Sequence, residues 1–182
     1  MKIFILMLLL LSSCSTPSKP AVYKTWTPII KTKSSSPINF YSRKNPYGEF
    51  SNFALFPITV DNKLWGTSEH YYQAHKYDQE KLQEYVRAAK SPEEAAKRGR
   101  QKDLPKRSNW KQVKDGIMYK ALVAKFTQHE NLKELLLSTG NSPLVEHTVR
   151  DKYWGDAGDG SGLNKLGKML SDIREKISKG LL

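Results

Sequence analysis

A glycine-rich segment near the end of the chain constrains the fold most strongly. From Trp154 to Gly167 it reads Trp-Gly-Asp-Ala-Gly-Asp-Gly-Ser-Gly-Leu-Asn-Lys-Leu-Gly. Glycine permits positive φ angles and a close approach of the backbone to a ligand, and a loop that opens a helix presents free N–H groups to anions. Asp156 and Asp159 suit sugar hydroxyls or a developing cation better than phosphate. The alternative interpretation is an exposed turn that ends in an Asn164 helix cap.

The composition is typical of a single globular domain with a basic surface. The 182 residues include 30 Lys and Arg against 18 Asp and Glu, a formal net charge of +12. Such a surface favours anionic partners, among them nucleotides, phosphorylated metabolites, nucleic acid and acidic lipid headgroups. Because the excess is spread over many predicted helices without a basic stripe or a reading helix, nucleic-acid binding is the weaker hypothesis.

The first residues differ from the rest of the chain in hydrophobicity. Lys2 precedes an unbroken apolar run over 3–11, which is too short to span a bilayer as a helix and fits a secretory signal. It leads into Leu11-Ser12-Ser13-Cys14, which resembles a bacterial lipobox, where cleavage before the cysteine is followed by acylation. The sequence therefore predicts a signal peptide at 1–13 and a lipid anchor at Cys14.

A flexible tether is expected between the anchor and the globular part. Residues 14–37 contain four prolines, several serines and few paired apolar positions, which is typical of a linker. The globular domain is therefore expected at 38–182. The expected location is the bacterial cell envelope, and Ser15 after the cysteine favours the outer membrane. A misassigned start codon would instead leave the protein in the cytoplasm.

Periodicity and turn signals predict one helix-rich α+β domain with a small β-sheet. A hairpin is expected around Asp61 and Asn62, and Thr67 or Ser68 is expected to cap the first helix. Strands are expected at 38–41, 58–60, 63–65 and 144–146, and helices at 68–77, 80–89, 92–99, 110–128, 131–137 and 164–179.

Glu69 is the strongest candidate for chemistry. It is expected in the first turn of its helix, near Trp65, Tyr71 and Tyr72. Aromatic surroundings exclude water from a carboxylate and raise its pKa, as general acid–base catalysis requires. Asp156 could supply a second carboxylate. The alternative for Glu69 is a favourable charge at a helix N-terminus and nothing more.

Neither a metal nor an organic cofactor is expected. The histidines at 70, 75, 129 and 147 lack a standard zinc spacing, and Cys14 is the single cysteine. Trp110 and Trp154 stand where an indole could stack on a base, although tryptophans more often anchor a core. Arg100 belongs to a basic cluster around two chain breaks, which could clamp phosphates or lie in solvent.

Several segments together resemble one known family. They are Tyr-Gly-Glu-Phe-Ser-Asn-Phe at 47–53, Trp-Gly-Thr-Ser-Glu-His-Tyr-Tyr-Gln-Ala at 65–74, Gly99-Arg100, Asn109-Trp110, Lys125-Phe126, Leu-Val-Glu-His at 144–147 and Tyr-Trp-Gly-Asp at 153–156 with the glycines that follow. In this order and spacing the chain resembles the YbiA/NADAR family of N-glycosidases over almost all of 38–176.

The resemblance implies hydrolysis of the bond between ribose C1′ and a nitrogen. Family substrates are phosphoribosylamino-pyrimidine intermediates of riboflavin synthesis, or ADP-ribose attached to a guanine base. Departure of the nitrogen leaves an oxocarbenium-like ribose, which a carboxylate can stabilise while it activates water. Nucleic acid would then be a partner only as a modified substrate, and the membrane a partner only through acylated Cys14. The competing hypothesis is a non-catalytic, lipid-anchored module that binds ADP-ribose-like ligands.

The resemblance also implies roles for individual residues. Glu69 matches the catalytic glutamate, while Asp156 and Asn52 match polar positions that hold ribose or the attacking water. Trp110 matches a tryptophan that stacks on the base, and the glycine segment with Asn164 is expected to accept ribose and phosphate. The expected catalytic residues are therefore Glu69 and Asp156, and the expected substrate-binding residues are Asn52, His70, Arg100, Trp110, Trp154, Gly155, Gly158, Gly160 and Asn164.

Overall fold

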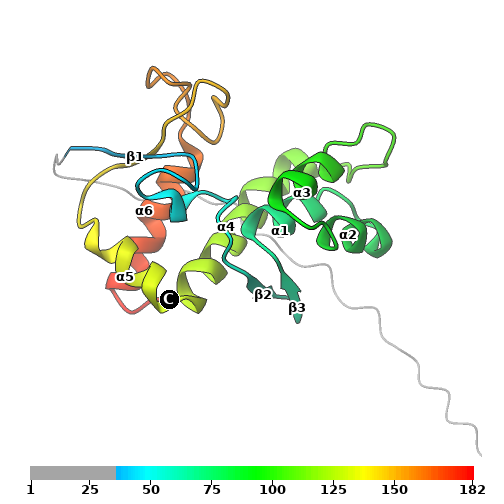
Figure 1. Cartoon of the computed structure of the whole chain (residues 1–182), viewed down its shortest axis with the longest axis horizontal. Helices are drawn as coiled ribbons and strands as arrows, with labels where there is room; N and C mark the ends of the chain where they lie inside the picture. Colours follow the sequence, from blue (N-terminus) through cyan, green and yellow to red (C-terminus); the bar gives the residue numbers. More distant parts are fainter. Residues whose placement is uncertain (1–35) are drawn as a thin grey trace, which may run out of the picture.

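The computed structural model describes residues 36–182 (Figure 1). The expected signal peptide, Cys14 and most of the expected tether lie outside the described residues. The elements are β1 Ile38–Phe40, the 3-10 helix η1 Gly48–Phe50, β2 Ile58–Val60, β3 Lys63–Trp65, α1 Ser68–Ala74, α2 Glu80–Arg87, α3 Pro92–Gly99, α4 Trp110–Gln128, α5 Glu130–Ser138, β4 Leu144–Glu146 and α6 Lys165–Ser178. The predicted helix-rich α+β class is confirmed.

The longest helix, α4, runs through the middle of the domain. It packs against α1 and β2 and also against α5 and α6, with α1, α2 and α3 to one side of it and β1, α5 and α6 to the other (Figure 1). Its buried face carries Ile117, Met118, Leu122 and Phe126, each at most 1% exposed. Burial of each such side chain stabilises the fold by about 1.5–3 kcal/mol, so α4 joins the two halves into one core.

The strands form two separate pairs, where one small sheet was expected. β2 and β3 are antiparallel, and Asp61 and Asn62 between them have φ angles of 55° and 60°, as a tight hairpin of the expected kind requires. β1 and β4 are parallel, with Phe40 opposite Glu146. This second pair brings the segment just before the glycine-rich loop to the start of the domain.

Helix α1 is buried along its whole length. The Thr67 hydroxyl accepts a hydrogen bond from the backbone N–H of His70 at 3.3 Å, which is the expected N-terminal cap. The helix ends at Ala74 and not at 77, because the chain tightens there: the N–H of Tyr77 donates to the carbonyl of Ala74, three residues back. The short helix therefore has no solvent-facing side, and each of its polar side chains needs a partner inside the protein.

A buried lysine fixes the loop that precedes α1. Lys125 of α4 is 0% exposed, and its ammonium donates to the carbonyls of Glu49 and of Ser51, the latter at 2.9 Å. The next carbonyl, of Asn52, accepts from the N–H of Glu69 at 3.3 Å. Lys125 therefore fixes the position of the loop at Asn52 relative to the first turn of α1.

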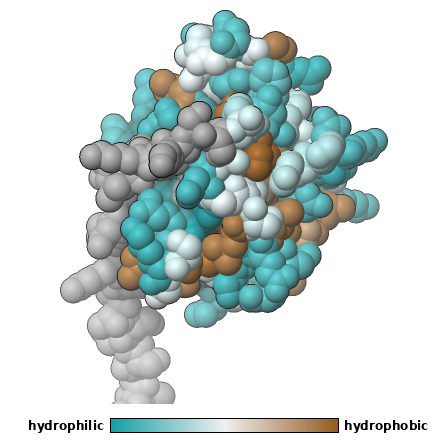
Figure 2. Space-filling model, turned by 90° about the vertical axis from the view of Figure 1, so that its left-hand side faces the viewer, coloured by the Kyte–Doolittle hydropathy of each residue, from teal (hydrophilic) through white to brown (hydrophobic). Residues whose placement is uncertain are grey.

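The surface is mostly hydrophilic. Figure 2 shows one face on which hydrophobic residues form limited patches between hydrophilic ones. Among the helices of residues 36–182, none combines the length and the hydrophobicity that a membrane crossing needs.

The first prediction concerns the stability that Lys125 contributes. Burial lowers the pKa of Lys125 to about 7, whereas a lysine in an unfolded chain titrates at about 10.4. Between these values the unfolded state binds more protons, so the Lys125 contribution to the free energy of unfolding rises with pH. We expect the free energy of unfolding of the wild type to rise by up to about 2 kcal/mol relative to Lys125→Met between pH 7 and 9.

Chemical denaturation at several pH values measures this difference. A constant difference in the free energy of unfolding between wild type and Lys125→Met across that range would contradict a lowered pKa of Lys125 in the folded protein.

Candidate active site

A cavity of about 220 Å³ lies where α1, α4, β4 and the loop after η1 meet. Its walls come from segments far apart in the chain, so it exists only in the folded domain. Four of the residues expected at a substrate site line it: Asn52, Glu69, Arg100 and Trp154. Sequence reasoning gave no role to Gln73, Lys76, Glu146 or Asp151, which line it as well.

Glu69 is a buried carboxyl group with one strong partner. It is 4% exposed, and its Oε1 accepts a hydrogen bond of 2.6 Å from Nε2 of Gln73, one helical turn further on. Burial raises the pKa of Glu69 above its ordinary value, although the Gln73 hydrogen bond and the charges of Lys76 and Arg100 act in the opposite direction. A buried carboxyl group whose pKa is raised is suited to accept or donate a proton near neutral pH.

Three buried oxygen atoms around the cavity have no hydrogen-bond partner among residues 36–182. They are Oδ1 of Asn52, Oε1 of Gln73 and Oε2 of Glu146. Buried polar atoms are nearly always paired in folded proteins, because an unpaired one costs about 1–3 kcal/mol. All three residues line the same cavity as Glu69. A ligand rich in O–H and N–H groups would satisfy them together.

Glu146 is the second carboxyl group of the cavity. Burial, followed by the nearby Asp151, Glu69 and Asp156, raises the pKa of Glu146 to about 8. The side chain leaves the end of β4, whose position depends on the long-range pairing with β1. No local pattern in the sequence brings Glu146 to Glu69, which is why it had no expected role.

The cations of the cavity lie beside Glu69. Burial chiefly lowers the pKa of Lys76 to about 8, although Glu69 acts to raise it. The Lys76 ammonium lies 5.5 Å from the ring centre of Tyr72 and 5.8 Å from that of Trp110. Trp154 packs edge-on against Tyr72 at 5.5 Å. Trp154 and Tyr72 therefore form an aromatic wall of the cavity, and Trp110 supports that wall from behind Tyr72.

Asp156 lies apart from this group. It lines a different cavity of about 500 Å³ together with Gly158, Gly160 and Asn164. Its carboxylate accepts hydrogen bonds from Nδ1 of His147 at 2.8 Å and from the backbone N–H groups of Thr148 and Gly158 at 3.1 and 2.8 Å. Burial alone would raise the pKa of Asp156, but these hydrogen bonds lower it. The structure thus shows Asp156 holding the glycine-rich loop together and corrects the expectation that it faces the same cavity as Glu69.

The glycine-rich loop folds against β4. A Cβ on Gly155 would lie 2.7 Å from the carbonyl oxygen of Glu146, so only glycine fits there. Asn164 has a φ of 46° and makes no side-chain cap. Its amide instead bonds the β4 backbone, accepting from Glu146 N–H at 3.0 Å and donating to the Leu144 carbonyl at 2.9 Å. Gly155 and Asn164 therefore position β4 and Glu146.

His70 points away from the cavity. Its Nδ1 lies 2.8 Å from the Thr67 hydroxyl and its Nε2 3.2 Å from the Ala89 carbonyl. Burial lowers the pKa of His70, which favours the neutral ring. This histidine connects α1 to the end of α2 and is not placed to contact a ligand beside Glu69, contrary to the expected binding role. Among residues 36–182, no three His, Cys, Asp or Glu side chains are grouped to hold a metal ion.

A buried carboxyl group facing unpaired hydrogen-bond acceptors fits an enzyme that cleaves glycosidic bonds. The NADAR domain model matches residues 39–178. N-glycosidase YbiA of Escherichia coli is 53% identical over 141 residues, covering 78% of this chain and 88% of that protein. The chloroplastic riboflavin biosynthesis protein PYRR of Zea mays is 39% identical over 155 residues, covering 77% of this chain and 25% of that protein.

A solved structure agrees with the fold. The NMR structure of E. coli YbiA matches with a TM-score of 0.74 and 52% identity, covering 80% of this chain and 86% of that one. The chain therefore belongs to the NADAR family. Its enzyme class is that of the N-glycosidases.

A substitution at Gly99 tests whether activity depends on the exact position of Gln73 beside Glu69. A Cβ on Gly99 would lie 2.2 Å from Oε1 and 2.7 Å from Cβ of Gln73. Gly99→Ala should therefore displace Gln73 from Glu69, with a loss of about 1–3 kcal/mol in stability from overpacking and a fall in kcat of about tenfold or more from misplacement.

Thermal unfolding and hydrolysis rates measure both effects. Gly140→Ala is the control for the rate: a Cβ there meets no atom within 4 Å, and its φ of 56° makes any residue other than glycine costly to stability at a position outside the cavity lining. Equal kcat for Gly99→Ala and Gly140→Ala would show that the Gln73–Glu69 contact does not set the rate.

Proposed function

We propose that this chain hydrolyses the bond between ribose C1′ and a base or amino nitrogen, with Glu69 as the catalytic carboxylate. The observation that carries the proposal is the buried Glu69 carboxyl group in a cavity with three unpaired oxygens. The substrates are a phosphoribosylamino-pyrimidine intermediate of riboflavin synthesis or ADP-ribosylated guanine. The name of the maize relative supports the first of these.

In the reaction, the bond between C1′ and the nitrogen breaks and its electron pair leaves with the nitrogen, which takes up a proton from solvent. The proton that Glu69 later accepts from the attacking water returns to solvent, so the enzyme is regenerated. The ribose becomes cationic at C1′, and the ionised Glu69 stabilises that charge at short range. Glu69 then accepts a proton from water as the water oxygen bonds to C1′. The products are a ribose with a hydroxyl at C1′ and the free base or amine.

The unpaired amide oxygens orient the sugar. Oδ1 of Asn52 and Oε1 of Gln73 accept hydrogen bonds from ribose hydroxyls in this arrangement, and Trp154 with Tyr72 covers one face of the ligand. Burial of these groups excludes bulk water, so the charge on Glu69 acts through a medium of low dielectric constant. Trp110 contributes by supporting Tyr72.

Glu69→Gln tests the catalytic role. The amide keeps the size of the side chain but neither carries charge nor accepts a proton, so kcat should fall by about 10²–10⁴-fold. Release of free base from N-ribosyl substrates by chromatography gives the rate, and circular dichroism checks the fold. Wild-type turnover by a folded Glu69→Gln variant would contradict the assignment.

The pH profile belongs to the same test. Because burial raises the pKa of Glu69 above its ordinary 4.5, kcat/KM should fall as the pH decreases through a midpoint above that value. The residual activity of Glu69→Gln should not show this fall of kcat/KM at low pH.

We also propose that the mature protein is anchored by a lipid on Cys14 in the bacterial cell envelope, with the outer membrane favoured. The support is the lipobox-like Leu11-Ser12-Ser13-Cys14 and the proline-rich stretch after it. Mass spectrometry of the N-terminus should find an acylated Cys14 in the wild type and none in Cys14→Ser, which should leave the membrane fraction. An intact, unmodified Met1 in the wild type would contradict the anchor and favour the cytoplasm.

A further inference from the structure

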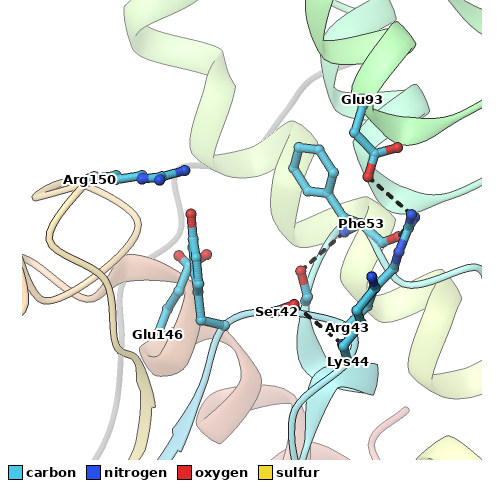
Figure 3. A pocket seen from close by; sticks show the side chains of 9 residues that line it. Ser42, Arg43, Lys44, Phe53, Glu93, Glu146 and Arg150 are labelled. Carbon is cyan, nitrogen blue, oxygen red and sulfur yellow. Dashed lines mark hydrogen bonds and ion pairs between the residues drawn. The ribbon is translucent and has the colours of Figure 1, made fainter.

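Glu146 lies between two cavities. It lines the Glu69 cavity and also a larger cavity of about 450 Å³, and Phe53 is the other side chain that lines both. Figure 3 shows Glu146 and Arg150 on one side of the larger cavity and Lys44 on the other. Lys44 and Arg150 are exposed, so this cavity is open to solvent. The Glu146 carboxyl group can therefore exchange protons with solvent while a ligand fills the Glu69 cavity.

The surroundings of Glu69 favour its ionised form. Its Oε1 accepts the 2.6 Å hydrogen bond from Gln73. This bond and the charges of Lys76 and Arg100 lower the pKa of Glu69 against the effect of burial. Donors and cations of this kind stabilise a carboxylate, so Glu69 is suited to act as the base.

The surroundings of Glu146 favour its protonated form. Its Oε2 is buried and has no hydrogen-bond partner among residues 36–182. The charged groups that shift its pKa, Asp151, Glu69 and Asp156, are all negative, and together with burial they raise that pKa to about 8. The adjacent His147 does not offset them, because it lies 2.8 Å from the Asp156 carboxylate. Two carboxyl groups in one cavity with pKa values driven apart are how enzymes provide an acid and a base at one pH.

The other ionisable groups of the cavity are less suited to give up a proton. Oδ1 of Asp151 accepts the backbone N–H groups of Tyr153 and Trp154 at 2.7 and 2.8 Å, so this carboxylate holds the loop together. The pKa of Lys76 is also about 8, but its positive charge acts to keep Glu69 ionised. Loss of the Lys76 proton during the reaction would therefore work against the base.

We propose that Glu146 is the general acid of the reaction and gives its proton to the nitrogen that leaves C1′. This inference rests on the proposed function and deepens it. As the bond between C1′ and the nitrogen breaks, its electron pair stays with the nitrogen and the proton of the Glu146 carboxyl group moves to that nitrogen. After water has bonded to C1′, Glu69 releases the proton it took from that water, and Glu146 takes up a new one from the larger cavity. The solvent proton that the nitrogen receives thus passes through Glu146.

Glu146→Gln in the full chain tests the proposal. The amide matches the protonated carboxyl group in size and charge but cannot give up a proton, so kcat should fall by about 10²–10⁴-fold while KM changes little. Chromatography of the base released from ADP-ribosylated guanosine or a phosphoribosylamino-pyrimidine measures both constants. Thermal unfolding at pH 7 should show no loss of stability. Glu134→Gln, on the exposed side of α5, is the matched control and should keep the wild-type kcat.

The pH profile identifies the group that gives the proton. In the wild type, kcat/KM should fall as the pH rises through about 8, where Glu146 loses its proton. This fall should be absent from Glu146→Gln and should return in Glu146→Asp, which again carries an ionisable carboxyl group.

Wild-type kcat in a folded Glu146→Gln variant would overturn the proposal. A fall of kcat/KM near pH 8 that persists in Glu146→Gln would also overturn it and would assign the proton to Lys76. Failure of the proposed function would show differently, as absence of base release by the wild type or as wild-type turnover by Glu69→Gln.

Discussion

The hydrogen bond from Gln73 to the buried carboxyl group of Glu69 is the contact on which the site depends. Glu69 is buried, and burying an ionised carboxyl group without a partner would destabilise the folded state by several kcal/mol. The surrounding structure keeps that bond in place: Gly99 leaves room for Gln73, and Lys125 holds the loop that meets the backbone of Glu69. The catalytic geometry is therefore a property of the core as much as of the cavity.

The carboxyl groups of the Glu69 cavity differ in how readily they ionise. Burial raises the pKa of Glu146 to about 8, so this side chain is mostly protonated near pH 7. Burial also raises the pKa of Glu69, but the Gln73 hydrogen bond and the charges of Lys76 and Arg100 act to lower it. In the proposed reaction the negative charge that faces C1′ therefore comes from Glu69.

Much of the fold could be predicted from the sequence, because it follows local rules. The Asp61–Asn62 hairpin, the Thr67 cap and the full extent of α4 were predicted from turn chemistry and periodicity, and the structure confirms them. The residues of the candidate active site were harder to predict. Gln73 lies one turn from Glu69 and carried a local signal, but Glu146 reaches the cavity through the pairing of β4 with β1, far away in sequence. The sequence of the glycine-rich loop also does not indicate which side of β4 the loop packs against. For this reason Asp156 was expected beside Glu69, although it lines a different cavity.

A structure of the Glu69→Gln variant with an intact N-ribosyl substrate would test the account most directly. We predict that C1′ lies against the side chain at position 69, with ribose hydroxyls bonded to Asn52 and Gln73. A ribose bound instead in the cavity beside Asp156, with its C1′ remote from position 69, would contradict the account.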